Sequence, residues 1–314
     1  MPDALGFRTI ADMPVQLPEA PASEAAKRAR FFNSGNAFNR VLAPVPDHAF
    51  VDESARALDR ATATGFVACD LSPALGCAGP ATTPLILARY LRIRPGERCA
   101  SRFDATGSLW YVIEGTGASE CGADRIEWRQ GDVFVLPGGA AQDHRAGPAG
   151  AVLWVVTNEP HLALENLRLP DDIAPPTDAV HYPAAEIAKQ LERIHAIAKG
   201  DNSAGYALMF SSERHAESRN VLPSFTLALN SLPPGEFQPP HRHNSAAVAL
   251  VVQGKDCYSL VDGRRKDWSP WATTVTPPTA VHSHHNDGSE RALFLIVQDG
   301  GLYCHARTMG FAAA

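Results

Sequence analysis

The chain has 314 residues, of which 45% are hydrophobic and 20% charged, so it is long enough for two domains with cores of their own. Its 28 basic and 34 acidic residues give a net charge of −6, and Lys and Arg form no sustained run. This balance disfavours nucleic acid and membrane surfaces as partners.

The opening residues show no secretory-signal pattern, and no window reaches the roughly 20 apolar residues of a membrane span. None of the six cysteines belongs to a CxxC pair, which is typical of reduced thiols and not of a disulfide framework or a zinc ribbon. We therefore expect a cytoplasmic protein, in which any metal chemistry depends on histidine.

Residues 1–82 carry two Ala- and Arg-rich segments, "ASEAAKRARFF" and "ESARALDRA", which predict short helices. The rest of this stretch has no catalytic signature. We interpret residues 1–82 as an N-terminal arm with short helices that packs on the remainder of the chain or across a subunit contact.

Two later regions, residues 83–170 and 206–314, contain short apolar runs that end at turn residues, as in an all-β protein. Each region has a strand that ends in Pro-Gly, a strand that closes on Gly, and a hairpin-like segment that ends in Trp. The matching residues are Pro95-Gly96 and Pro234-Gly235, Gly115 and Gly254, and Trp128 and Trp268. Similar spacing in both regions predicts a duplicated β-domain.

Residues 171–205 lie between these regions. Their first part is proline-rich, as in a linker, and their second part has Ile187, Leu191, Ile194 and Ala198 at helical spacing, with Gly200 as a stop. This segment predicts a linker and one helix that bridges the two domains.

The second region contains a histidine pattern typical of a metal site. His241 and His243 are two residues apart, so on a strand both side chains face the same side. If the following strands are antiparallel, a later strand returns beside them and places His282 opposite the pair. Three neutral imidazoles in an apolar barrel form a metal site with open coordination positions.

The stretches "LPPGEFQPPHRHNSAAVALVVQG" and "TPPTAVHSHHN" resemble the paired motifs of the cupins, and the two regions together resemble a bicupin of the gentisate and salicylate 1,2-dioxygenase kind. The resemblance implies two tandem jelly-roll barrels and a non-haem Fe(II) bound by the three histidines. It also implies ring cleavage of a hydroxylated aromatic carboxylic acid with dioxygen, in a homo-oligomer.

The resemblance has one departure beside the metal motif. The general cupin pattern places a Glu where this chain has Ala247. Three neutral ligands leave the full charge of the metal uncompensated, which favours an anionic substrate that chelates it through carboxylate and phenolate oxygens.

His284 matches the second histidine of the ring-cleaving family's motif, and the resemblance implies an acid/base or substrate-binding role for it. His285 is expected to face the other way, and Asn286 to stabilise a turn. As further substrate contacts we predict Gln298, Arg291, Tyr258 and Trp268, which lie on or beside the last strands.

The first region lacks the histidines of the second. Arg102 and Asp104 stand at the positions that spacing assigns to the histidine pair, and Gln142 at the third position, so we predict a degenerate, metal-free barrel. In the dioxygenases that the chain resembles, the metal-bearing barrel comes first. The reversed order leaves the identity of the substrate open.

Two other functions fit the same motifs. A zinc- or manganese-dependent lyase, isomerase or hydrolase would use three histidines in the same way. A bicupin that binds a small ligand without catalysis would also retain the fold.

Overall fold

The computed structural model describes residues 6–170, 173–197 and 205–313. The chain divides into two compact units, the first ending at Ala43 and the second beginning at Pro44. Within the described ranges, no helix is long and apolar enough to cross a membrane.

The first unit is small and has no core among its described residues. It contains a 3-10 helix, η1 (Ile10–Asp12), and one turn of α-helix, α1 (Glu24–Lys27), which begins at Ser23 because the Ser23 hydroxyl accepts a hydrogen bond from the Ala26 amide. None of its described residues is buried. Capping and backbone bonds therefore maintain this unit, not apolar burial.

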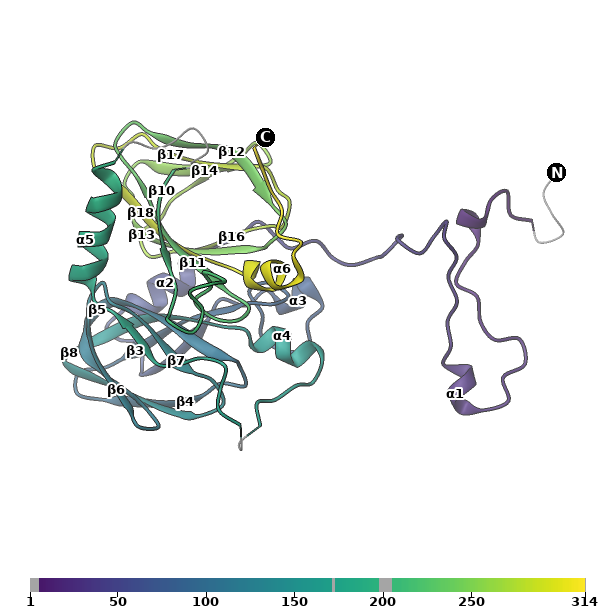
Figure 1. The fold of residues 1–314 in the computed structure, drawn as a ribbon, viewed down its shortest axis with the longest axis horizontal. Helices are drawn as coiled ribbons and strands as arrows, with labels where there is room; N and C mark the ends of the chain where they lie inside the picture. Colours follow the sequence, from purple (N-terminus) through teal and green to yellow (C-terminus); the bar gives the residue numbers. More distant parts are fainter. Residues whose placement is uncertain (1–5, 171–172, 198–204, 314) are drawn as a thin grey trace. The chain divides into compact units, whose positions relative to one another are not determined.

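The first barrel is a single antiparallel sheet in the order β2-β3-β8-β5-β7-β9, with β4 paired to β8 and β6 to β5 (Figure 1). Its two longest strands, β5 and β8, carry register shifts that let each bend and join both sides of the barrel. Strands β2 and β9 pair with this sheet although they lie outside residues 83–170. The strands are β2 (Gly65–Ala68), β3 (Leu87–Ile93), β4 (Arg98–Arg102), β5 (Gly107–Cys121), β6 (Asp124–Arg129), β7 (Val133–Pro137), β8 (Ala141–Thr157) and β9 (Val180–Tyr182).

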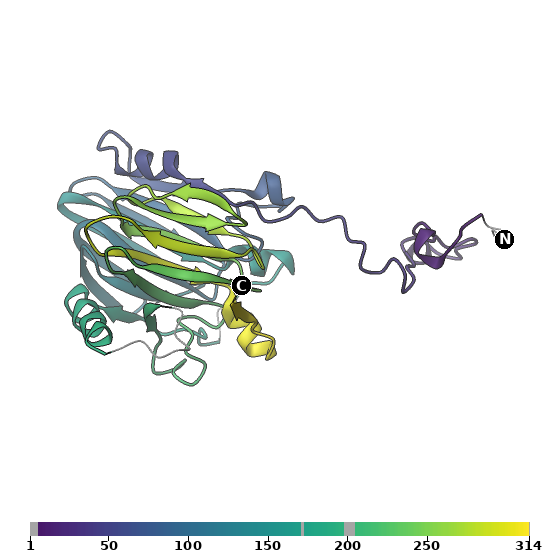
Figure 2. The same ribbon diagram turned by 90° about the horizontal axis from the view of Figure 1, so that it is seen from above.

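The second barrel has two antiparallel sheets, β1-β16-β13-β18-β11-β10 and β15-β14-β17-β12-β19. Figure 2 shows the strands of this barrel from above, running side by side. Between β14 and β15 the chain reverses at Asp262-Gly263, where both residues have positive φ, as a two-residue hairpin turn requires. The strands are β1 (Ala49–Phe50), β10 (Tyr206–Phe210), β11 (Thr226–Leu232), β12 (Phe237–His243), β13 (Ala247–Gln253), β14 (Cys257–Val261), β15 (Arg264–Asp267), β16 (Thr273–Thr276), β17 (His282–Asn286), β18 (Ala292–Gln298) and β19 (Phe311–Ala313).

The two barrels share one hydrophobic core. Alternate residues of β3, β5, β7 and β8 face those of β11, β13, β16 and β18, and all are buried. The Tyr90 hydroxyl and the Trp154 indole nitrogen of the first barrel both bond Thr273 Oγ1 of the second, at 2.7 and 2.9 Å. Burial of this face from both sides makes the two barrels a single packed body.

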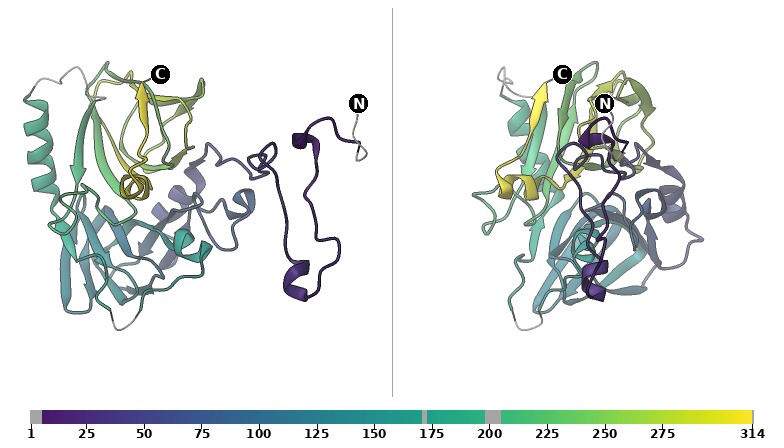
Figure 3. Two further views of the ribbon diagram at one scale, coloured as in Figure 1. Left: turned by 45° about the vertical axis from the view of Figure 1, so that its right-hand side comes forward. Right: turned by 90° about the vertical axis from the view of Figure 1, so that its right-hand side faces the viewer.

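Short helices surround the barrels (Figure 3). The predicted bridging helix is α5, which buries Ile187 and Leu191, whereas Ala198 and Gly200 lie outside the described residues. Helix α6 runs beside the second barrel and leads into β19, which pairs with β12. The other helices are α2 (Val51–Leu58), α3 (Ser72–Leu75) and α4 (Glu159–Leu164), and the bounds of α5 and α6 are Ala184–His195 and Gly300–Ala306. The predicted all-β architecture of two barrels with N-terminal helices and a bridging helix is confirmed.

Candidate metal centre

Three histidines meet inside the second barrel. Along β12, His241 and His243 are buried while Arg242 between them is exposed, and His282 of β17 is the register partner of His241. One ligand atom from each of the three rings lies within 4.8 Å of the other two. The antiparallel return that the sequence predicts therefore brings these residues together, as a group that could hold a metal ion.

Backbone carbonyls fix the tautomer of all three rings. The Nδ1 atoms of His241, His243 and His282 lie 2.8, 2.8 and 2.9 Å from the carbonyl oxygens of Pro239, Ser245 and Ala280. A carbonyl oxygen can only accept, so each Nδ1 carries the proton and donates it. Each Nε2 is then unprotonated, the form in which imidazole binds a metal, although that of His243 accepts a hydrogen bond from Gln298.

Burial also keeps these rings neutral. Loss of hydration lowers the pKa of His241 and of His243 below the ordinary value, and that of His282 to about 3. At neutral pH protons therefore do not compete with a cation for the three lone pairs.

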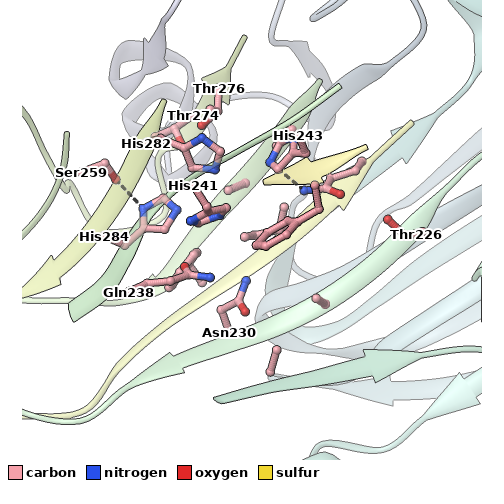
Figure 4. Close-up of a pocket in the computed structure, with 18 of the residues that line it drawn as sticks. Thr226, Asn230, Gln238, His241, His243, Ser259, Thr274, Thr276, His282 and His284 are labelled. Carbon is pink, nitrogen blue, oxygen red and sulfur yellow. Dashed lines mark hydrogen bonds between the residues drawn. The ribbon is translucent and has the colours of Figure 1, made fainter. Parts of the chain in front are cut away.

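His284 lies beside the three-histidine cluster but has a different environment. It is buried, and its Nδ1 is 2.8 Å from Ser259 Oγ instead of a carbonyl oxygen. Burial holds the pKa of His284 well below its usual value. Figure 4 shows Ser259 on one side of the ring and the other histidines on the opposite side.

A cavity of about 200 Å³ opens beside the histidines. None of the described residues around it carries a formal charge, so a bound cation would be the dominant charge in the cavity. The walls are Ala207, Met209, Thr226, Ala228, Asn230, Gln238, Ala247, Ala249, Val251, Ser259, Trp268, Thr274, Thr276, Phe294, Ile296, Gln298, Met309 and Phe311, together with the four histidines.

Two of the predicted substrate contacts line this cavity. Gln298 donates from Nε2 to His243 Nε2 at 3.1 Å, and Trp268 contributes its indole to the wall. Tyr258 and Arg291 do not line it. Tyr258 alternates with inward-facing Ser259 and so stacks on His285 on the outer face, while Arg291 forms an ion pair with Glu192 of α5.

Two buried amides that sequence reasoning missed face the histidines (Figure 4). Asn230 comes from β11 and Gln238 from the start of β12, and Gln238 Oε1 is buried with no hydrogen-bond partner in the described part of the chain. Asn230 follows Leu229 as a polar residue in a buried strand, and this is the sequence signal that could have found it. The sequence has no such signal for Gln238. Met309 and Phe311, from the segment after α6, were also missed, and Phe311 stacks on His241 with the ring centroids 5.2 Å apart.

Among its described residues the first barrel has no comparable cluster, and the reason corrects the prediction made from spacing. Arg102 and Asp104 are exposed, and Ser101 is the register partner of Gln142, as His241 is of His282. A register shift between Gln238 and His241 adds one residue to β12, so counting from the Pro-Gly turn that both regions share misplaces the match. The positions equivalent to His241 and His243 are thus Ser101 and the buried Phe103.

Comparisons with known proteins agree with this geometry. The family model described as "Cupin domain" matches residues 228–298. A gentisate 1,2-dioxygenase of Ralstonia sp is 38% identical over 73 residues, which is 23% of this chain and 21% of that protein. A 5-aminosalicylate 1,2-dioxygenase of Comamonas sp is 34% identical over 83 residues, 26% of this chain and 22% of that protein. The chain thus matches only about a fifth of the length of these curated relatives.

The fold match is much broader. The salicylate 1,2-dioxygenase of Pseudaminobacter salicylatoxidans superposes with a TM-score of 0.72 over 86% of this chain and 88% of that chain, at 13% sequence identity. Residues 228–298 are thus similar to the cupin domain, and the two barrels have the fold of that dioxygenase. The chain is similar to gentisate and salicylate dioxygenases, and its three-histidine site points to a metal cofactor.

Proposed function

We propose that the protein is a non-haem Fe(II) dioxygenase that cleaves the ring of a hydroxylated aromatic carboxylic acid, of the gentisate or salicylate kind. The observation that carries the proposal is the set of three Nε2 lone pairs at one end of a cavity whose described walls have no formal charge. The structural neighbour salicylate 1,2-dioxygenase has been crystallised with gentisate, an acid of this class.

His241, His243 and His282 would bind the iron. When bound, Fe(II) supplies Lewis acidity and a site for dioxygen next to the organic substrate. Because all three ligands are neutral and Ala247 occupies the position of the usual cupin Glu, the protein contributes no negative charge to the centre. An anionic carboxylate and phenolate would supply that charge, which supports an aromatic hydroxy acid as the substrate.

The remaining polar walls would orient the ring. Gln298 reaches the histidine cluster, and the amides of Asn230 and Gln238 lie opposite it, where they can hydrogen-bond a hydroxyl or amino substituent. His284 would donate or receive a proton at the substrate oxygen. Between these groups, Ala228, Ala249 and Ile296 leave apolar room for the ring itself.

Oxygen consumption tests the proposal directly. Protein loaded anaerobically with Fe(II) is mixed with aerated gentisate, salicylate, 5-aminosalicylate or 1-hydroxy-2-naphthoate, and uptake is followed with an oxygen electrode. We expect uptake with at least one of these acids and background rates in His241→Ala. Arg242→Ala, which changes the exposed neighbour of the same strand, is the matched control and should retain uptake.

The alternatives are outcomes of the same experiment. Tightly bound zinc or manganese in the isolated protein, with no oxygen uptake after iron loading, would overturn the dioxygenase and favour a lyase or isomerase. Ligand binding without any turnover would favour a non-catalytic bicupin.

We also propose that the protein forms a homo-oligomer. In the first unit, Phe32, Phe38, Val41 and Leu42 are exposed, and an uncovered apolar set of this kind is typical of a contact surface. Light scattering on the full chain should give a mass of at least two copies, and a monomer at micromolar concentration would contradict this.

A further inference from the structure

Ser259 lies between an indole and an imidazole in the second barrel. Trp268 donates its Nε1 hydrogen to Ser259 Oγ at 2.8 Å, and the same oxygen is 2.8 Å from His284 Nδ1. Ser259 and His284 are register partners on neighbouring strands, β14 and β17. The three side chains form one hydrogen-bonded series that ends at the cavity wall.

The direction of these bonds follows from counting hydrogens. An indole nitrogen can only donate, so Ser259 Oγ accepts from Trp268. Among the described residues, the only other partner of this hydroxyl is His284 Nδ1, and a buried hydroxyl that only accepted would have its own hydrogen unsatisfied. Ser259 therefore donates to Nδ1, and the single proton of the neutral ring is on Nε2, toward the cavity.

This tautomer is the opposite of the one found in the three cluster histidines. Carbonyl oxygens place the proton of those rings on Nδ1, whereas a hydroxyl places the proton of His284 on Nε2. One wall of the cavity thus has three lone pairs for a metal and one N–H donor beside them. His284 differs from His282 in this respect although the two are only two residues apart.

Packing holds the indole in place. A Cβ at Gly254 would lie 2.6 Å from Trp268 Cε3, so the absence of a side chain there is what lets the indole reach Ser259. Phe294 contacts the indole edge-on, with centroids 4.8 Å apart, and also packs on His284 at 4.7 Å. These contacts leave Trp268 one orientation in which its nitrogen faces the hydroxyl.

The first barrel repeats the series without the cluster. Trp128 Nε1 donates to Ser119 Oγ at 2.8 Å, and Ser119 Oγ is 2.7 Å from His144 Nδ1. There the ring is capped, because His144 Nε2 lies 3.1 Å from Ser101 Oγ. The series is therefore part of the duplicated scaffold, and the second barrel differs in directing the N–H into a cavity.

We propose that Ser259 and Trp268 are positioning residues that hold His284 as the Nε2–H tautomer, so that it presents a hydrogen-bond donor to the substrate oxygen at the metal. The effect on turnover rests on the proposed dioxygenase function. The tautomer itself does not, and it can be measured in metal-free protein.

The test is long-range proton–nitrogen NMR of metal-free protein with ¹⁵N-labelled histidine, with the His284 signals identified by their loss in His284→Gln. We expect the Nε2–H pattern for His284 and the Nδ1–H pattern for the three cluster histidines. Ser259→Ala should convert His284 to a mixture or to Nδ1–H, and Ser259→Thr, which retains the hydroxyl, should preserve Nε2–H. Trp268→Phe is an independent variant, with the same expected direction as Ser259→Ala, should the alanine variant fold poorly.

Turnover gives the second readout. With iron content unchanged, Ser259→Ala should lower kcat by roughly tenfold, the scale typical of a lost outer-shell partner, and Ser259→Thr should restore it. Ser119→Ala is the matched control, since it removes the same bond from the metal-free barrel and should leave kcat unchanged. An Nδ1–H pattern for His284 in the wild type, or an unchanged Nε2–H pattern in both Ser259→Ala and Trp268→Phe, would overturn the proposal. The expected tautomers without oxygen uptake by the wild type would instead reject the dioxygenase and leave the positioning role intact.

Discussion

The two barrels have the same frame but different interiors. In the second barrel Ala249 pairs with Thr274, and at the matching register of the first barrel Trp110 pairs with Phe134. The Trp110 ring stacks on Phe134 with the ring centroids 5.7 Å apart, and its centroid is 4.2 Å from that of His144. These rings fill the interior of the first barrel. The cavity of the second barrel therefore exists because small side chains occupy positions that the first barrel gives to aromatic ones.

The positions of the histidine cluster differ in the same way. Where the second barrel has His241, His243 and His282, the first has Ser101, Phe103 and Gln142. A hydroxyl, a phenyl ring and an amide offer no strong nitrogen ligand. Yet both barrels have the Trp-Ser-His series, so the same buried hydrogen bonds occur with and without the histidine cluster.

The largest effect is expected when the second barrel receives the residue of the first at the third ligand position. His282→Gln should remove stoichiometric metal and bring oxygen uptake to background, because two imidazoles remain and an amide is a weak ligand. Metal analysis by mass spectrometry together with the oxygen electrode measures both. The reverse change, Gln142→His, should add no second metal ion, and a second equivalent of bound metal in it would contradict the assignment of Ser101 and Phe103.

Emptying the first barrel should affect stability and not function. Trp110→Ala removes a fully buried indole and should lower the free energy of unfolding by about 3–5 kcal/mol. Chemical denaturation measures the loss, while the metal content of the folded protein should remain that of the wild type. A loss of metal without a loss of stability would mean that the first barrel supports the metal centre directly.

Filling the cavity of the second barrel should affect substrate binding more than stability. Ala249→Trp places in the cavity the indole that the first barrel has at this position. The indole would occupy the space of the substrate ring, and the steric cost of about 1–3 kcal/mol should weaken substrate binding up to roughly 100-fold. Metal binding should persist, since Ala249 makes no ligand contact. Anaerobic calorimetry with the aromatic acid measures the change. Ala249→Ser, which keeps the side chain small, is the control and should retain the wild-type affinity. Wild-type affinity in the Trp variant would show that the substrate binds elsewhere.

Sequence patterns predicted the fold and the histidine cluster because both depend on local regularity. Pro-Gly turns delimit the strands, and a period of two places His241 and His243 on one face. What depends on register could not be predicted. The extra residue before His241 shifted its expected counterpart in the first barrel to Arg102. Only the observed strand pairing shows that Tyr258 faces outward and that Asn230 and Gln238 face inward. Small residues such as Ala249 carry no signal until their larger counterparts are known.

Acid should destabilise the protein, and His144 of the first barrel should contribute to this loss beside the four buried histidines of the second. Burial lowers the pKa of His144 to about 3, below the ordinary value near 6.5 expected in the unfolded chain. The unfolded state therefore binds one more proton between these values, so stability is complete above pH 6.5 and falls as the pH decreases toward 3. Between pH 7 and 5 this histidine should cost about 2 kcal/mol. Denaturation of His144→Gln at both pH values should show a correspondingly smaller loss, and an equal loss in both proteins would contradict the assignment.

The smallest change tests why the second barrel has no carboxylate beside its three histidines. Ala247 lines the cavity and pairs with Gln298, so Ala247→Glu would place a negative charge where most cupins have one. The metal should be retained, but the anionic substrate would meet like charge, and its affinity should fall about tenfold, or about 1.4 kcal/mol. Ala247→Gln has the same size without the charge and should lose much less. Anaerobic titration of both variants with the aromatic acid separates the effect of the charge on substrate affinity from the effect of side-chain volume. Equal losses would mean that the small side chain, and not its neutrality, is what the substrate requires at this position.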